Sequence, residues 1–123
     1  MPNKNLSDFE KYILFEKGTE PPFSGEYNDF FENGIYVCKN CGNELYCSDS
    51  KFRGHCGWPS FDGQINNNVR QIPDKDGIRI EIVCAKCEAH LGHVFYGEGF
   101  TNKNVRHCVN SVSLLFLSQN ENK

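Results

Sequence analysis

Seven cysteines are the residues of this chain best suited to chemistry, and their spacing divides them into pairs and singles. The pairs are Cys38-x-x-Cys41 and Cys84-x-x-Cys87, and the singles are Cys47, Cys56 and Cys108. Each pair follows a strand-like stretch, and Gly42 permits a tight turn around a metal after the first pair. Four thiolates on two such turns make a tetrahedral site without an open position for substrate. The expected Zn²⁺, one per chain, is therefore structural.

The paired cysteines have two alternative interpretations. One pair could be a dithiol redox centre or half of a disulfide, but two pairs of the same spacing favour zinc. The metal could instead be catalytic, with substrate or water displacing one thiolate, although four matched cysteines leave no obvious open coordination position. The pairs lie much farther apart in sequence than in a compact zinc ribbon, so the metal would connect distant parts of a larger fold.

Cys108 lies outside the predicted zinc set, in the segment Arg106-His107-Cys108-Val109-Asn110-Ser111. A cysteine in an apolar strand is more often an inert core residue than a nucleophile. The histidines of His90-Leu91-Gly92-His93 could lower its pKa or deliver a proton, and Arg106 supplies a fixed positive charge nearby in sequence. Either histidine could instead be a satisfied surface or core residue, and the two face opposite sides of an ideal strand unless Gly92 permits a bulge. A redox-active thiol is the leading hypothesis for Cys108.

Cys56 places a second thiol beside the only tryptophan, in Cys56-Gly57-Trp58-Pro59-Ser60-Phe61. Glycine and proline hold this segment as a loop, which could approach a site. Trp58 and Phe61 could form an aromatic wall for an apolar group, or they could be core anchors, which is the commoner role of buried rings. From the residues alone, the core role is favoured.

The elements that must position these residues are expected to be mainly β. From residue 34 onward, short runs rich in Val, Ile, Phe and Tyr are punctuated by Gly, Pro, Asn and Asp, which predicts antiparallel strands. The last strand is expected to run from Val105 to Leu117. Its alternation puts Arg106, Cys108 and Asn110 on one face, so Cys108 and Asn110 can share a site.

The N-terminal part, residues 1–33, is expected to contain one helix and an arm. A capping box of Ser7 and Glu10, with Phe9, Tyr12 and Ile13 at helical spacing, predicts a helix over roughly residues 8–17 that Gly18 stops. Two prolines in the segment 20–25 prevent a helix there and predict an extended arm over the body. Residues 34–118 would form the β body, and residues 119–123 a polar tail.

Length and charge limit the classes of partner. A chain of 123 residues is expected to be one domain with a modest core, which a zinc ion would help to stabilise. The net charge of -3 and the lack of a Lys/Arg cluster argue against nucleic acid or an anionic membrane as partner. We find no bilayer-length apolar run and no secretory signal, and the odd cysteine count fits a reducing compartment. The expectation is a cytoplasmic monomer.

The chain as a whole resembles the B-type methionine sulfoxide reductases, which reduce the R epimer of methionine sulfoxide in the repair of oxidised proteins. The resemblance runs nearly end to end. It is carried, in the family's order, by the segments 18–27, 36–42, 48–52, 56–61, 79–87, 90–95 and 106–111. The family's body is two antiparallel sheets packed as a small β-sandwich-like barrel, wrapped by the N-terminal segment. In many members the four paired cysteines bind structural zinc.

The resemblance also implies roles for the single cysteines. Cys108 would attack the sulfoxide sulfur as a thiolate and become a sulfenic acid as methionine leaves. Cys56 matches the resolving cysteine, which would condense with the sulfenic acid to give a Cys56–Cys108 disulfide that a dithiol such as thioredoxin reopens. Cys47 could compete with Cys56 as the resolving thiol, although a buried bystander is the preferred interpretation.

The resemblance further implies how the substrate is held. His93 would be the leading proton donor. The S-methyl group would lie against Trp58 and either Phe95 or Phe61, because a ring face favours a methyl on electron-poor sulfur. The polar side of the site would be shaped by His90, Asn110, Arg106 and Glu81.

The chain departs from the family pattern at several places, including Gly54-His55, Ile78 and Cys47, and one rival function stays open. His107 stands where members carry Tyr or Phe, and strand alternation should point it away from Cys108. The loop 96–104 also has an unusual composition, which could change the preferred substrate context. The rival is a non-enzymatic, zinc-stabilised β module that binds a protein or nucleotide partner and needs neither Cys108 nor Cys56.

Overall fold

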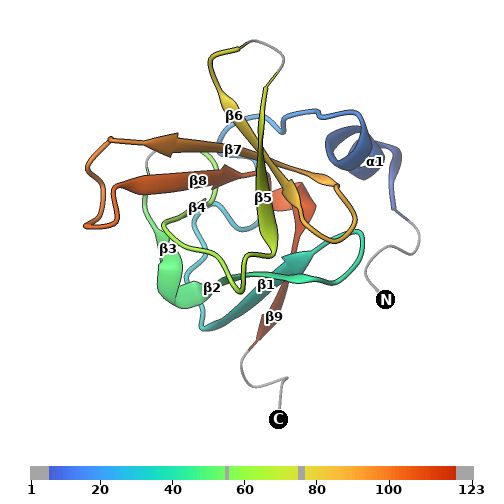
Figure 1. Cartoon of the computed structure of the whole chain (residues 1–123). Coiled ribbons are helices and arrows are strands. Elements are labelled where there is room, and N and C mark those ends of the chain that lie inside the picture. Colours follow the sequence, from blue (N-terminus) through green and yellow to red (C-terminus); the bar gives the residue numbers. More distant parts are fainter. Residues whose placement is uncertain (1–5, 55, 75–76, 119–123) are drawn as a thin grey trace.

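Two antiparallel β-sheets enclose one core in the computed structural model, which describes residues 6–54, 56–74 and 77–118 (Figure 1). The smaller sheet has the order β2 (Glu44–Cys47), β1 (Gly34–Cys38), β9 (Leu114–Ser118). The larger has the order β3 (Lys51–Phe52), β4 (Ser60–Phe61), β8 (Val105–Val109), β7 (His90–Tyr96), β6 (Ile80–Cys84), β5 (Val69–Pro73). The expected mainly β fold with two antiparallel sheets is confirmed, and the described strands form no closed barrel.

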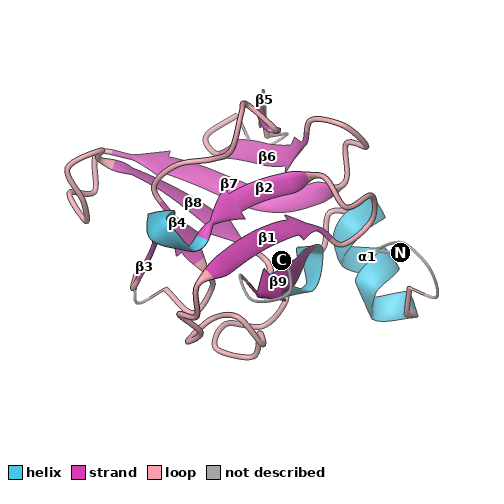
Figure 2. Ribbon diagram, turned by 90° about the horizontal axis from the view of Figure 1, so that it is seen from below, coloured by secondary structure: helices cyan, strands magenta, loops and turns pink. Residues whose placement is uncertain are grey.

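Aromatic rings hold the two sheets together. Tyr46 of the smaller sheet stacks on Phe61 of the larger one, with ring centroids 4.2 Å apart, and Tyr36 meets Phe61 edge-on at 5.2 Å. All three side chains are fully buried, and rings of this size bury the largest apolar area per residue. Figure 2 shows the smaller sheet lying across the larger one, with α1 (Asp8–Phe15) at one end. Among the described residues, no helix is both long and apolar enough to span a membrane.

The N-terminal helix forms where the sequence predicts it, with the Ser7/Glu10 capping box present. It ends at Phe15 rather than near residue 17, because Lys17 adopts a left-handed φ of 61° and Gly18 then donates its N–H to the carbonyl of Tyr12. Ile13 is buried, but Phe9 and Tyr12 are each 48% exposed, because Leu14 joins Ile13 on the buried side.

The prediction of one strand from Val105 to Leu117 is wrong. The chain leaves β8 after Val109, makes a 3-10 turn at Ser111–Ser113 and enters the other sheet as β9. Side-chain hydrogen bonds stabilise this crossing: Asn110 Nδ2 donates to the Leu91 carbonyl at 3.1 Å, and Ser113 Oγ donates to the His90 carbonyl at 2.9 Å. The crossing puts Asn110 directly beyond the end of the Cys108 strand.

The expected bulge near Gly92 is confirmed. In the β6–β7 pairing, Ile82 faces Gly92 and Val83 faces His90, so Leu91 is the extra residue. The bulge brings the His90 and His93 rings to the same side, with centroids 5.8 Å apart.

The arm after the helix lies over the body as expected. The backbone N–H of Tyr27 donates to Ser111 Oγ at 3.1 Å, and the Tyr27 hydroxyl accepts from the N–H of Phe116 at 3.1 Å. These bonds tie the arm to the segment that crosses between the sheets, at Ser111, and to β9, at Phe116. The expected polar tail, residues 119–123, lies outside the described residues, and the division of the chain at residues 33 and 118 stays a prediction.

Candidate active site

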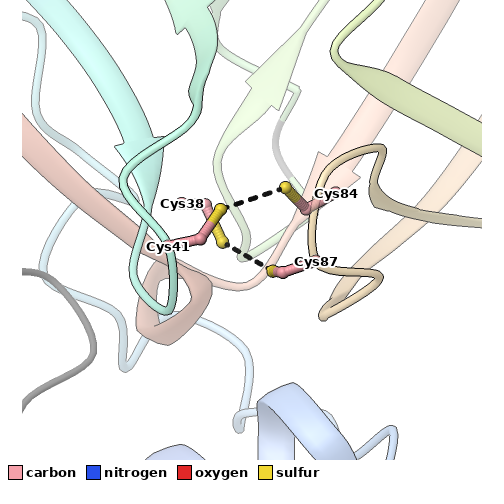
Figure 3. A group of neighbouring side chains, drawn as sticks. All are labelled: Cys38, Cys41, Cys84 and Cys87. Carbon is pink, nitrogen blue, oxygen red and sulfur yellow. Dashed lines mark hydrogen bonds between the residues drawn. The ribbon is translucent and has the colours of Figure 1, made fainter.

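The four paired cysteines meet at one end of the two sheets (Figure 3). Cys38 ends β1 and Cys84 ends β6, and their turns share one backbone pattern. In the first turn the N–H of Gly42 donates to the Cys38 carbonyl at 2.9 Å, and in the second the N–H of Glu88 donates to the Cys84 carbonyl at 2.8 Å. Gly42 has a φ of 82° and Glu88 a φ of 65°, so the second turn makes the same shape without glycine.

The geometry of this cluster fits zinc. Sγ atoms of opposite turns are 3.6 Å apart in both the Cys38–Cys87 and the Cys41–Cys84 pairs, and all four lie within 4.8 Å of one another. Tetrahedral Zn–S bonds of about 2.3 Å place sulfurs about 3.8 Å apart. A hydrogen bond to Cys84 and burial raise the pKa of Cys38, so a cation is needed to hold four thiolates here. The cluster can hold one zinc ion, which would connect the smaller sheet to the larger.

Two cysteines outside the four-cysteine cluster lie beside a cavity of about 150 Å³. Cys56 Sγ, from the loop before β4, is 3.8 Å from Cys108 Sγ on β8. Both residues line the cavity. The other predicted site residues that line it are Trp58, His93, Phe95, Arg106 and Asn110. The structure therefore brings together most of the residues that the sequence singled out.

Arg106 provides a fixed positive charge at this sulfur pair. Its Nη1 donates to Cys56 Sγ at 3.1 Å, while Nε and Nη2 donate to the two carboxylate oxygens of Glu98 at 2.7 and 3.1 Å. The guanidinium also lies 4.7 Å from the ring centroid of Phe95. The Glu98 hydrogen bonds raise the pKa of Arg106 further, so its charge is permanent.

The pKa values of the two thiols shift in opposite directions. A hydrogen bond from Cys108, helped by the Trp58 backbone, Ser60 and Arg106, lowers the pKa of Cys56 to about 5. The same hydrogen bond, with burial, raises the pKa of Cys108. The hydrogen bond between the two thiols is the largest cause of both pKa shifts, and the Arg106 N–H that contacts Cys56 Sγ favours the same direction for Cys56. In the reduced protein the negative charge therefore favours Cys56.

The two histidines occupy different depths. His93 faces Cys108 across the β7–β8 pairing, lines the cavity and is hydrogen-bonded through Nε2 to Asp74 Oδ2 at 2.7 Å. His90 is buried and does not line the cavity. Its Nδ1 is hydrogen-bonded to Glu81 Oε2 at 2.8 Å, and its Nε2 has no partner among the described residues.

Glu81 is the fixed charge beneath the histidines. It is 1% exposed and does not line the cavity, and its Oε1 accepts from Lys17 Nζ at 2.9 Å. Although burial opposes it, hydrogen bonds from Lys17 and His90 lower the pKa of Glu81. Burial lowers the pKa of His90. His90 and Glu81 therefore lie behind His93 rather than at the cavity wall.

Phe61, the alternative to Phe95 as a substrate-binding ring, lies in the core. It is fully buried against Tyr36 and Tyr46 and does not line the cavity, whereas Phe95 does. Trp58 is half-buried and lines the cavity. The core role that the residues alone favour for Phe61 is the one that its position supports.

The other two residues with open roles lie away from the sulfur pair. His107 is buried, and its Nδ1 is hydrogen-bonded to the Tyr46 hydroxyl at 2.8 Å. Burial lowers the pKa of His107 to about 4. It points to the core side of β8, as strand alternation predicts. Cys47 is half-buried in the smaller sheet, where it pairs with Ile35.

Sequence reasoning missed Glu20, which connects several parts of the site. Its N–H donates to Asn110 Oδ1 at 3.0 Å, and its carbonyl accepts from Trp58 Nε1 at 2.9 Å. The side-chain Oε1 accepts from the N–H of Val112 at 2.9 Å. Burial raises the pKa of Glu20. The two prolines that follow marked the arm as extended, but no sequence signal indicated what it would contact.

Asp74 and Glu98 were also missed. Each is a loop carboxylate that holds a cavity residue, His93 for Asp74 and Arg106 for Glu98. The unusual composition of residues 96–104 was the one available signal for Glu98.

Comparison with known proteins reveals extensive similarity. Residues 6–118 match the SelR domain family. The chain is 53% identical over 116 residues to peptide methionine sulfoxide reductase B2, chloroplastic, of Arabidopsis thaliana, covering 94% of this chain and 57% of that protein. It is 53% identical over 112 residues to peptide methionine sulfoxide reductase B5 of Oryza sativa subsp. japonica, covering 90% of this chain and 82% of that protein.

A third relative, peptide methionine sulfoxide reductase B3, chloroplastic, of Oryza sativa subsp. japonica, is 51% identical over 117 residues. The alignment covers 94% of this chain but 51% of that protein, so the chain spans only about half of the two chloroplastic relatives. Among solved structures, the Mis18 'Yippee-like' domain superposes with a TM-score of 0.53 at 15% identity, covering 71% of this chain and 97% of that domain. At this identity the likeness concerns the fold alone.

Proposed function

Because the chain belongs to the SelR domain family, the oxidoreductase family of the B-type methionine sulfoxide reductases, we propose that it reduces methionine-R-sulfoxide in peptides or proteins to methionine. One observation supports this activity above the others: Cys56 and Cys108 are 3.8 Å apart at a cavity that also exposes His93, Trp58 and Phe95. The two sulfurs are close enough to form a disulfide after a modest rearrangement.

In the first half-reaction, Cys108 Sγ attacks the sulfoxide sulfur. The Cys108 proton passes to the neighbouring Cys56 thiolate, which makes Cys108 the nucleophilic thiolate when substrate is in place. His93, held by Asp74, donates a proton to the sulfoxide oxygen as its bond to the substrate sulfur breaks. The hydroxyl passes to Cys108 Sγ as the bond between the two sulfurs breaks and methionine leaves with its electron pair. Cys108 thereby becomes a sulfenic acid and loses the two electrons that the substrate gains.

Substrate binding divides between apolar and polar walls. Trp58 and Phe95 hold the S-methyl group, and Asn110 and Arg106 contact the polar part of the substrate. His90 and Glu81 act from behind His93 by fixing its position and surroundings. The cavity is small, which suits one sulfoxide side chain of a larger protein substrate.

In the second half-reaction, Cys56 attacks the sulfenic sulfur of Cys108 and water leaves, giving the Cys56–Cys108 disulfide. A thioredoxin-like dithiol reopens it by exchange. Zinc at the closed four-cysteine site would stabilise the fold and takes no part in these steps. We also propose that the protein is a cytoplasmic monomer that binds neither nucleic acid nor membranes. Two of the relatives are named as chloroplastic.

The rival binding module would not need the second sulfur pair. Cys108→Ser is expected to abolish methionine formation from a peptide containing R-methionine sulfoxide. Cys56→Ser should retain one round of chemistry and lose turnover with a dithiol. Cys47→Ser serves as the matched control and should retain turnover. Full turnover in Cys108→Ser would reject Cys108 as the nucleophile. No methionine from the unaltered protein would reject the reductase function and favour the binding module.

A further inference from the structure

Arg106 is positioned to act on Cys56, the proposed resolving cysteine. Arg106 is 8% exposed, and its guanidinium is held on three sides, by the bidentate Glu98 carboxylate, by the Phe95 ring and by Cys56 Sγ. A rigid, permanently charged donor 3.1 Å from a sulfur stabilises the thiolate of that sulfur relative to the thiol.

The loop that carries Glu98 is shaped to present it. Gly97 and Gly99, on either side of Glu98, have left-handed φ values of 84° and 76°. The N–H of Gly97 donates to the Asn104 carbonyl at 3.0 Å, and the N–H of Gly99 donates to Asn104 Oδ1 at 2.8 Å. An added Cβ at either glycine would meet nothing within 4 Å, so backbone conformation rather than space requires glycine there. The loop thus closes on itself with Glu98 directed at Arg106.

We propose that Arg106, oriented by Glu98, is a catalytic residue of the second half-reaction, in which it activates Cys56 for attack on the Cys108 sulfenic acid. This inference rests on the reductase function proposed above. Arg106 favours loss of the Cys56 proton, and the resulting thiolate attacks Cys108 Sγ. The S–S bond forms as the S–O bond breaks, and the departing hydroxide takes up the proton as water. The Cys56 thiolate supplies the electron pair of the S–S bond, and the S–O electron pair leaves with the hydroxide, so no outside reductant is needed.

Glu98 is the positioning residue of this pair. Its side chain is 36% exposed on a surface loop, so Glu98→Gln should fold normally and weaken the orientation of Arg106 without leaving a large cavity. Arg106→Lys keeps a positive charge but cannot contact Glu98 and Cys56 together in the same way. Arg70→Gln is the matched control, because Arg70 is an exposed arginine that also pairs with a carboxylate, that of Glu88.

The test is a rapid-quench time course with reduced protein and a peptide containing R-methionine sulfoxide, without reductant. Methionine, the sulfenic acid trapped by dimedone and the Cys56–Cys108 disulfide are each quantified. Arg106→Gln should slow disulfide formation by at least about tenfold more than it slows methionine formation, with sulfenic acid accumulating, and Glu98→Gln should show the same pattern more weakly. Arg106→Lys should recover part of the disulfide rate, and Arg70→Gln should match the unaltered protein.

The pH dependence of the rate of disulfide formation distinguishes activation of Cys56 by Arg106 from a merely structural effect. Loss of the charge should move the pH midpoint of disulfide formation upward, toward that of an ordinary thiol. Equal slowing of both steps, or an unchanged disulfide rate and pH midpoint, would overturn the inference while leaving the reductase function intact. Absence of methionine in the unaltered protein would instead overturn the proposed function, and the inference with it.

Discussion

The backbone carbonyl oxygen of Cys108 occupies the space that a side chain on Gly92 would need. The two residues lie on the adjacent strands β7 and β8, beside the Leu91 bulge and at the edge of the cavity. Glycine at this position therefore lets the strand of the proposed nucleophile approach the strand of the proposed proton donor.

Gly92→Ala tests this close approach. The added methyl must displace the backbone of Cys108, and overpacking of this kind costs about 1–3 kcal/mol. We expect a lower midpoint in urea unfolding together with slower methionine formation. Gly63→Ala is the control, because its added Cβ would meet only side-chain ends, Lys103 Nζ at 3.3 Å and Ser50 Oγ at 3.4 Å. Equal stability of the two variants would contradict the steric role of Gly92.

Metal removal should destabilise the whole fold. The four cysteines come from turns at the ends of β1 and β6, one in each sheet, so zinc would hold the two sheets together. Elemental analysis should find one zinc per chain. Chelation should lower the Tm by 10 °C or more, on the order of 2 kcal/mol or more for a domain of this size. A metal-free protein with an unchanged Tm would contradict the structural role.

His107 should make stability depend on pH. Burial lowers its pKa from 6.5 to about 4 in the folded state, so the unfolded chain binds the proton first as the pH falls. The contribution of neutral His107 is complete above pH 6.5 and is lost progressively toward pH 4, up to about 3 kcal/mol. Urea unfolding at several pH values should show a steeper decline in the unaltered protein than in His107→Phe. Parallel declines would show that His107 does not titrate in this way.

Glu20 should couple the arm to the aromatic wall. Glu20→Ala removes the side-chain acceptor of the Val112 N–H in a buried place and should cost about 1–3 kcal/mol. Glu20→Gln keeps the size and the acceptor and should be tolerated, since burial already raises the pKa of the acid. Trp58 donates to the Glu20 carbonyl and is the only tryptophan, so its fluorescence reports the arm directly. If Trp58 emission is the same in Glu20→Ala as in Glu20→Gln, the claim that Glu20 couples the arm to Trp58 is contradicted.

The sequence predicted those parts of the site that depend on local spacing. The Cys-x-x-Cys turns specify the metal ligands because each turn positions its own two sulfurs. The period of a strand likewise placed Arg106 and Cys108 on the cavity side and His107 on the core side. These features need only the conformation of a few consecutive residues.

Features that depend on contacts between distant segments were not predicted. β8 ends at Val109 because Asn110 and Ser113 find acceptors on β7, at Leu91 and His90, which no local pattern indicates. The residues alone favoured a core role for Phe61, but its partner in that core, Tyr46 of the other sheet, was not predictable from local spacing. The carboxylates of Asp74 and Glu98 reach the cavity residues from loops whose direction depends on the whole fold.

The most direct test of the central claim is one turnover of the fully reduced protein with a peptide containing R-methionine sulfoxide, in the absence of any reductant. Methionine is quantified, and the thiols are mapped by mass spectrometry. We expect one equivalent of methionine per chain and a Cys56–Cys108 disulfide, because these sulfurs lie 3.8 Å apart. A disulfide from Cys108 to Cys47 would contradict the assignment of Cys56. No methionine together with an intact Cys108 thiol would contradict the reductase function itself.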